Sequence, residues 1–320
     1  MDKQNDTTSR RADLVEISVE TDGEAAEAIS AVLGQYGIGG AVVEEVWPTD
    51  PSQSPAVRVK AFLPGDRADQ LRTVEIALWH LARIHPFSEP QIRTLQQADW
   101  QDAWKAGYTV QHIGERIAVK PSWLDFAAQP GHIVVELDPG MAFGTGLHPS
   151  TRLMLEAMER HLIVDAPVLD VGTGSGILSI VAAKMGGRPI QALEIDDLAI
   201  GVARDNVRRN HVDHAVRVHR ASLTPVGIQA RQSDIPEVFN RTGDWNGAFA
   251  TVLMNILAEV IAECAPALAA CLAPSGTFIV AGIILPREHL VQQALDAAGL
   301  VVVERLQQAD WLALVGGKRH

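Results

Sequence analysis

The segment that most constrains the fold is a glycine-rich run at residues 170–176, with the sequence DVGTGSG. It directly follows a short apolar stretch, 168–171, and directly precedes a helical pattern, 176–185. Glycines let a ligand approach the backbone because no Cβ intervenes, and the first turn of a helix offers unpaired N–H groups. The run therefore predicts a ligand-binding turn between a strand and a helix of an α/β sheet.

The spacing of the glycines narrows the ligand class. A dinucleotide fingerprint needs a third glycine three residues after the second, and Ile177 occupies that position. The run also lacks the Gly-Lys-Ser/Thr ending of a nucleoside triphosphate loop. Nicotinamide, flavin and triphosphate binding are therefore disfavoured.

An acidic residue at the end of the next strand is the usual partner of such a turn. Glu194 lies 22 residues after Gly172, where its carboxylate could accept hydrogen bonds from a ribose diol. Asp196 and Asp197 are explained by the start of a helix, where acidic caps are favourable. That structural reading explains Glu194 less well.

From residue 167 onward, short apolar runs alternate with helical stretches, which predicts a parallel sheet covered by helices. The expected strands are 168–171, 190–195, 215–219, 248–253 and 276–281, and the expected helices are 176–185, 198–210, 258–272 and 286–298. Two closing strands, 301–307 and 311–315, could pair as a hairpin at the sheet edge. The polar stretch 224–244 is read as a surface insertion.

Two further places near this sheet could contribute to chemistry. Asn255 is expected where the fourth strand ends, and it could either hold an acceptor amine or cap the following helix. The glycine-rich segment 139–151 could close over a ligand, with Phe143 supplying an apolar face and His148 a polar tip. Ser150 or Thr151 could cap the helix after it. A catalytic role for His148 is kept as a candidate beside the commoner structural role of a single histidine.

The N-terminal region has a different pattern. Residues 1–12 contain almost no apolar side chain and are expected to form a disordered tail. Residues 13–98 then read as strand, helix, two strands, helix and a last strand at 91–95, which is the order of a small split βαβ sandwich. A connector at 99–130 is rich in aromatic residues, for which packing is favoured over a stacking role. They are Trp100, Trp104, Tyr108 and Trp123.

Composition sets the remaining limits. A chain of 320 residues usually makes two domains, and a formal charge of -12 opposes direct binding to nucleic acid. Cys264 and Cys271 lack partners at metal-ligand spacing, so we expect buried thiols and no metal. The apolar stretch 251–274 contains carboxylates and a proline, so we expect a strand and a packed helix, no membrane span, and a cytoplasmic protein.

Several segments together make a family recognisable. The loop 140–151, the run 170–176 and Asn255-Ile256-Leu257-Ala258-Glu259 resemble the bacterial ribosomal protein L11 methyltransferase family. The resemblance is supported by Asp99-Trp100, Trp104-Lys105, Pro121-Ser122-Trp123 and the closing stretch 310–314, and it is weaker in the N-terminal region. It implies an α/β fold, with a Rossmann-like seven-stranded methyltransferase domain at 131–320 and a ferredoxin-like substrate-recognition domain at 13–98.

The resemblance also implies an activity. It implies transfer of methyl groups from S-adenosylmethionine to lysine side chains and the N-terminal amine of ribosomal protein L11. We expect the protein to be a monomer. The residues it places at the cofactor or the reaction are Thr151, Gly172, Glu194 and Asn255, with Asp170, Gly174, Phe143 and His148 as further candidates. The family usually has Asp at 194, Thr at 150 and Ala at 254. A different acceptor, or a non-catalytic module that binds the same cofactor, stays open as an alternative.

Overall fold

The computed structural model describes residues 14–21, 23–37, 41–46, 56–65, 67–83, 87–95, 109–138, 148–230 and 245–319. They divide into two compact units, one within 14–95 and the other within 109–319. The predicted tail and the first half of the predicted connector lie outside these ranges. Residues 109–130, the second half of the predicted connector, fall within the larger unit and include two strands of a separate small sheet.

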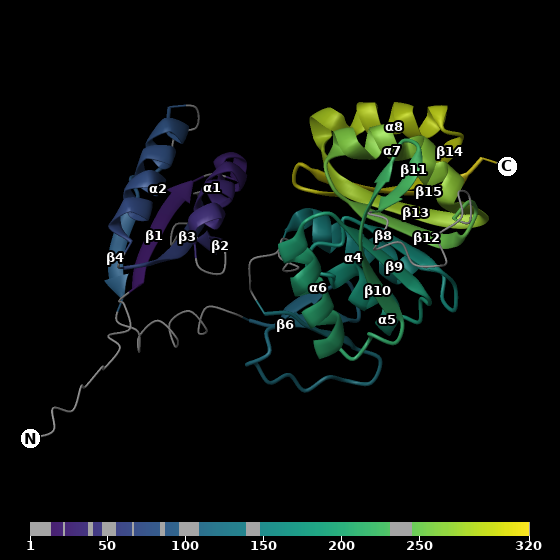
Figure 1. Ribbon diagram of the computed structural model, residues 1–320, viewed down its shortest axis with the longest axis horizontal. Coiled ribbons are helices and arrows are strands. Elements are labelled where there is room, and N and C mark those ends of the chain that lie inside the picture. Colours follow the sequence, from purple (N-terminus) through teal and green to yellow (C-terminus); the bar gives the residue numbers. More distant parts are fainter. Residues whose placement is uncertain are drawn as a thin grey trace, which may run out of the picture. The chain divides into compact units, whose positions relative to one another are not determined.

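The smaller unit is a four-stranded antiparallel sheet with two helices (Figure 1). Its elements are β1 (Leu14–Thr21), α1 (Gly23–Tyr36), β2 (Ala41–Val46), β3 (Ala56–Pro64), α2 (Ala68–Leu81) and β4 (Gln91–Leu95). The strand order is β2-β3-β1-β4. Ile17 and Val19 alternate toward the helices, where they bury against Ile29, Leu33 and Leu78. The order of these elements is the one expected from the sequence.

The larger unit contains a sheet with helices on both of its faces. Its main elements are α4 (Pro149–His161), β8 (Val168–Val171), α5 (Ile177–Lys184), β9 (Ile190–Glu194), α6 (Asp197–Arg209), β10 (Val216–Thr224), β11 (Gly227–Ala230), β12 (Phe249–Asn255), α7 (Ala258–Cys271), β13 (Leu272–Ile284), α8 (Glu288–Ala297), β14 (Leu300–Gln308) and β15 (Trp311–Lys318). The strand order is β11-β10-β9-β8-β12-β13-β15-β14. The five strands from β10 to β13 run parallel.

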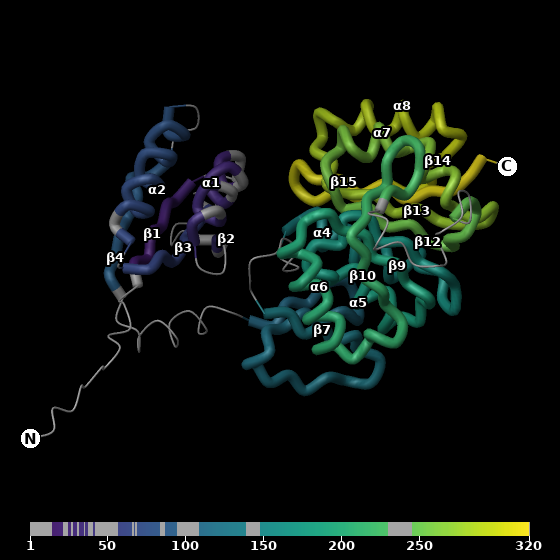
Figure 2. The backbone as a smooth tube through the Cα atoms, in the orientation of Figure 1, coloured from purple at the N-terminus to yellow at the C-terminus, as the bar shows by residue number. Residues whose placement is uncertain are grey.

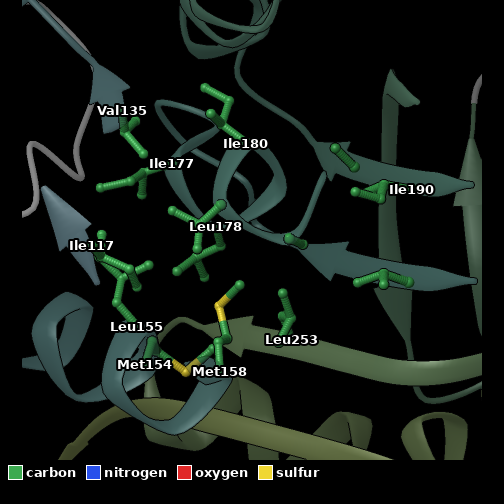
Figure 3. Packing of buried hydrophobic residues seen from close by; sticks show 14 of the residues in the cluster. Ile117, Val135, Met154, Leu155, Met158, Ile177, Leu178, Ile180, Ile190 and Leu253 are labelled. Atoms are coloured by element: carbon green, nitrogen blue, oxygen red, sulfur yellow. The ribbon is translucent and has the colours of Figure 1, made fainter. Parts of the chain in front are cut away.

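The order of the strands reverses at β8, which is the point where open α/β sheets bind ligands. Figure 1 shows α7 and α8 on one face of the sheet and α4, α5 and α6 on the other. Two separate apolar clusters fill these layers. Figure 3 shows the α4–α5 side, where Met154 and Met158 lie beside Leu178 and Leu253.

The sheet has eight strands among the described residues, one more than predicted. The additional strand is β11, which pairs antiparallel with β10 through a two-residue turn between Thr224 and Gly227. The start of the predicted insertion is therefore a hairpin, whose tube can be followed in Figure 2. Residues 231–244 of the insertion lie outside the described ranges. The closing hairpin is confirmed, with β14 at the other edge.

A second small sheet was not predicted at all. It consists of β5 (Gln111–Ile113), β6 (Ile117–Lys120) and β7 (Ile133–Glu136). Asn210, at the end of α6, attaches this small sheet to that helix. Its Oδ1 accepts a hydrogen bond from the N–H of Glu136 (2.9 Å), and its Nδ2 donates to the carbonyl of the same residue (2.8 Å). The asparagine side chain therefore substitutes for a strand partner beside β7.

The apolar stretch 251–274 forms β12 and α7, as predicted, with Ile261, Leu268 and both cysteines buried. Within the described ranges, none of the helices combines the length and apolar character needed to cross a membrane.

Replacing Asn210 by alanine should lower the free energy of unfolding by about 1 to 3 kcal/mol, because two backbone groups of Glu136 lose their partners. The matched control is Asn246→Ala, since Asn246 is exposed and its change should cost less than about 0.5 kcal/mol. Urea denaturation of both variants checks this. Equal losses in the two variants would show that Asn210 does not anchor the small sheet.

Candidate active site

Three adjacent strands bring the predicted residues to one edge of the sheet. β9, β8 and β12 are neighbours and run parallel, so their carboxyl ends coincide. Glu194 is the last residue of β9, Gly172 follows β8, and Asn255 is the last residue of β12. Residues that lie far apart in sequence therefore meet at the switch point of the sheet.

The glycine loop is held from beneath by Asp170. This residue is fully buried at the centre of the sheet, and its Oδ2 accepts hydrogen bonds from the hydroxyls of Thr173 and Ser179, both at 2.6 Å. The loop and the first turns of α5 are thereby joined to one carboxylate. Burial raises the pKa of Asp170, and the nearby charge of Glu194 adds to the rise. Asp170 supports the loop from inside the core.

Glu194 closes the loop from the side. Its Oε2 accepts from the N–H of Gly174 (2.9 Å), and its Oε1 accepts from the N–H groups of Ile195 (2.8 Å) and Asp196 (3.2 Å). The predicted helix start is also confirmed, because the side chain of Asp196 caps α6 through the N–H of Leu198. Glu194 therefore differs in role from Asp196, which caps the helix, because the half-buried carboxylate of Glu194 faces the glycine loop.

Asn255 contacts a residue 104 positions earlier in the chain. Its Nδ2 donates a hydrogen bond to the Oγ1 of Thr151 at 3.2 Å. Thr151 is fully buried in the first turn of α4. The reading of Asn255 as a helix cap is wrong, because α7 begins at Ala258 and its N-cap is Leu257, which makes no side-chain capping bond. The side-chain amide of Asn255 instead lies at the carboxyl ends of the parallel strands, and its nitrogen is hydrogen-bonded to Thr151.

His148 caps α4, which corrects the expectation that Ser150 or Thr151 does so. Its Nδ1 accepts from the N–H of Ser150 (3.2 Å) and lies 2.7 Å from the hydroxyl of that residue. The ring also packs edge-on against Trp311, with centroids 4.4 Å apart. Burial lowers the pKa of His148 to about 4, so the ring is neutral at pH 7. A catalytic role for His148 stays a prediction.

One sequence signal could have identified this cap. Proline is enriched at the first position of helices, and Pro149 occupies that position in α4. The residue before it is then the N-cap. Phe143 and the rest of the segment 139–147 lie outside the described residues. Sequence reasoning also missed Trp311 beside His148 and Ile256 beside Gly172.

The chemical character of the site follows from these groups. The carboxylate of Glu194 offers acceptors for hydroxyl groups, and the loop that leads into α5 presents backbone at close range. Asn255 adds a side-chain amide at the end of β12, which is separated from β9 by β8. Such a set fits a ligand with a ribose on one side and a reacting group directed toward Asn255.

Comparison with known proteins identifies the family. The family described as ribosomal protein L11 methyltransferase has a model that matches residues 13–319. A relative of that name from Chloroflexus aurantiacus is 43% identical over 319 residues, covering 94% of this chain and 97% of its own length. The chain belongs to the ribosomal protein L11 methyltransferase family.

Other relatives agree with this assignment. The methyltransferase of the same name from Herpetosiphon aurantiacus is 37% identical over 320 residues, covering 95% of this chain and 98% of its own. The crystal structure of a ribosomal protein L11 methylase from Lactobacillus delbrueckii subsp. bulgaricus is similar with a TM-score of 0.57 and 28% identity. It covers 67% of this chain and all of that one. The chain thus has the α/β fold of methyltransferases.

The partly buried ring of His148 predicts a pH dependence of stability. The folded pKa is about 4, below the unfolded value of 6.5, so below pH 6.5 the unfolded chain binds a proton that the folded chain does not. This contribution is fully present above pH 6.5 and is lost as the pH falls toward 4.

The variant His148→Asn keeps a good helix cap and removes the titrating ring. Between pH 6.5 and 4, its stability should fall less steeply than that of the wild type, by up to about 1 kcal/mol per pH unit. Chemical denaturation at several pH values measures both slopes. Identical slopes would mean that the ring takes up its proton in the folded protein as easily as in the unfolded one.

Proposed function

We propose that this methyltransferase transfers methyl groups from S-adenosylmethionine to amino groups of ribosomal protein L11, namely lysine side chains and the N-terminal amine. The observation that supports this most is the pairing of Asn255 with Thr151 beside the glycine loop and Glu194. It places an amide that can hold an amine next to a loop suited to a nucleoside. The substrate assignment follows the names of the relatives.

The residues at the loop fit the proposed methyl donor. Oε2 of Glu194 accepts one backbone hydrogen bond, and a carboxylate oxygen can accept two, so a ribose hydroxyl has an acceptor there. Gly172, Gly174 and Thr151 complete the proposed contacts, with Asp170 beneath the loop and Phe143 from the preceding segment. When bound, the cofactor supplies an electrophilic methyl group on a sulfonium.

The role proposed for Asn255 is to hold the acceptor amine. Its nitrogen donates to Thr151, so its Oδ1 is the atom directed at an incoming N–H. A lysine amine has an ordinary pKa near 10.4 and must lose its proton to become a nucleophile. A neutral acceptor such as an amide oxygen can bind the N–H of the neutral amine, and it favours the charged form less than a carboxylate would. The amine is thereby aligned for in-line attack.

The remaining assignments are proposals of the same kind. The smaller unit, with its order β-α-β-β-α-β, is proposed to be a ferredoxin-like domain that recognises the substrate protein, within 13–98. The methyltransferase domain is proposed to comprise seven core strands, with β11 as an addition. A cytoplasmic monomer that does not bind nucleic acid directly agrees with the formal charge of -12.

The direct test of the activity is mass spectrometry of purified ribosomal protein L11 after incubation with the protein and S-adenosylmethionine. We expect added multiples of one methyl mass. The variant Asn255→Ala should lower turnover by about 100-fold, since a misplaced acceptor loses alignment. Thr151→Val, which removes only the hydroxyl partner, should lower turnover by a smaller factor.

Two outcomes would redirect the proposal. Unchanged turnover in Asn255→Ala would remove that residue from the reaction. Cofactor binding without any methylation of L11 would point to another acceptor or to a cofactor-binding module without catalysis.

A second prediction concerns the cofactor. Glu194→Gln should weaken binding of S-adenosylmethionine by about 10- to 100-fold, since a hydrogen bond to a charged group is worth about 1.5 to 3 kcal/mol. The control is Asp213→Asn, which removes the same charge before the start of β10 and so at the opposite edge of the sheet. Isothermal titration calorimetry measures both affinities. Equal affinities in the two variants would contradict the ribose contact.

A further inference from the structure

Ile256 directly follows Asn255 at the end of β12, and the role proposed for Asn255 does not account for the position of Ile256 in the sheet. β12 lies between β8 and β13 in the sheet. Met254 is opposite Val171, and Asn255 is opposite Ala281. The next residue along each of the three strands is therefore Gly172, Ile256 and Gly282. Ile256 has a glycine on either side at the ligand edge.

The side chain of Ile256 covers the first of these glycines. A methyl group added at Gly172 would lie 2.5 Å from Cγ2 of Ile256, closer than carbon atoms approach in proteins. Gly172 also has a φ of +71°, in the left-handed region that favours glycine. The branch at Cβ of Ile256 is thus in direct contact with the backbone of the proposed cofactor loop.

The backbone of Ile256 is fixed by the second glycine. A methyl group added at Gly282 would overlap the carbonyl oxygen of Ile256 and lie 3.1 Å from its nitrogen. Gly282 has a φ of +84°, and the pairing of β13 with β15 shifts register between Ala281 and Ile283. The peptide of Ile256 therefore lies directly on the bulged backbone of β13, with no space to move toward it.

We propose that Ile256 is a positioning residue that sets the distance between the cofactor loop and Asn255. This inference rests on the proposed function, in which the loop holds the methyl donor and Asn255 holds the amine. Valine and isoleucine are stiff at χ1, so Cγ2 of Ile256 acts as a fixed spacer against Gly172. In-line transfer depends on such alignment, and small displacements cost large factors in rate.

The test separates the branch at Cβ from side-chain size. Ile256→Val keeps Cγ2 and loses one terminal carbon, whereas Ile256→Leu keeps all carbons and loses the branch. We expect turnover within about threefold of wild type for Ile256→Val. For Ile256→Leu we expect kcat to fall by about tenfold or more, with KM for both substrates within about threefold. Melting temperatures should differ little between the two variants.

The control is the same pair of changes at Ile261, which is buried in the same apolar cluster on α7. Ile261→Leu and Ile261→Val should leave kcat unchanged even where they lower the melting temperature. Equal kcat values for Ile256→Val and Ile256→Leu, or values that follow the melting temperatures, would overturn the proposal.

A double-mutant cycle gives a readout that does not need turnover. Gly172→Ala introduces the methyl group that meets Cγ2 of Ile256. It should therefore lower the melting temperature more when combined with Ile256→Val, which keeps that carbon, than when combined with Ile256→Leu, which lacks it. Equal decreases would overturn the contact itself. If the wild type does not methylate L11, the proposed function fails, and this cycle still decides whether Ile256 sets the loop.

Discussion

The parallel pairing of β9, β8 and β12 is the constraint on which the site depends. Parallel strands end at the same edge, so each of these strands brings a functional residue to that edge at or just after its carboxyl end. Glu194, Gly172 and Asn255 come together for this reason alone. The helices on both faces bury the sheet and leave this edge as the place where polar side chains can reach a ligand.

Much of this arrangement can be predicted from sequence because its signals are local. A strand, a glycine loop and a helix follow one another within residues 168–184, and Glu194 ends the next apolar run. Hydrophobic periodicity also predicts the smaller unit, because each of its six helices and strands coincides with its own stretch of the hydrophobic pattern. Local signals were sufficient wherever one segment decides its own structure.

The missed features depend on contacts between distant segments. The small sheet β5–β7 has strands of only three or four residues, too short for a clear hydrophobic period, and Asn210 reaches it from the end of α6. The partnership of Asn255 with Thr151 spans 104 positions and could not be read from either residue. The N-cap at His148 is different, because Pro149 marks the first position of α4 and so makes the cap predictable from sequence. It was missed because serine and threonine are the preferred N-cap residues.

The way in which Glu194 carries its charge matters for binding. Its carboxylate accepts hydrogen bonds from three backbone N–H groups, and among the ion pairs of the described chain it has no basic side-chain partner. Backbone amides are fixed by the fold, so a ligand does not have to displace an arginine or lysine before it binds. A carboxylate held in this way is oriented in advance, and it still has acceptor capacity for hydroxyl groups. The bond from the N–H of Gly174 also ties the loop to the end of β9, so the group proposed to bind the ribose holds the loop proposed to bind the rest of the nucleoside.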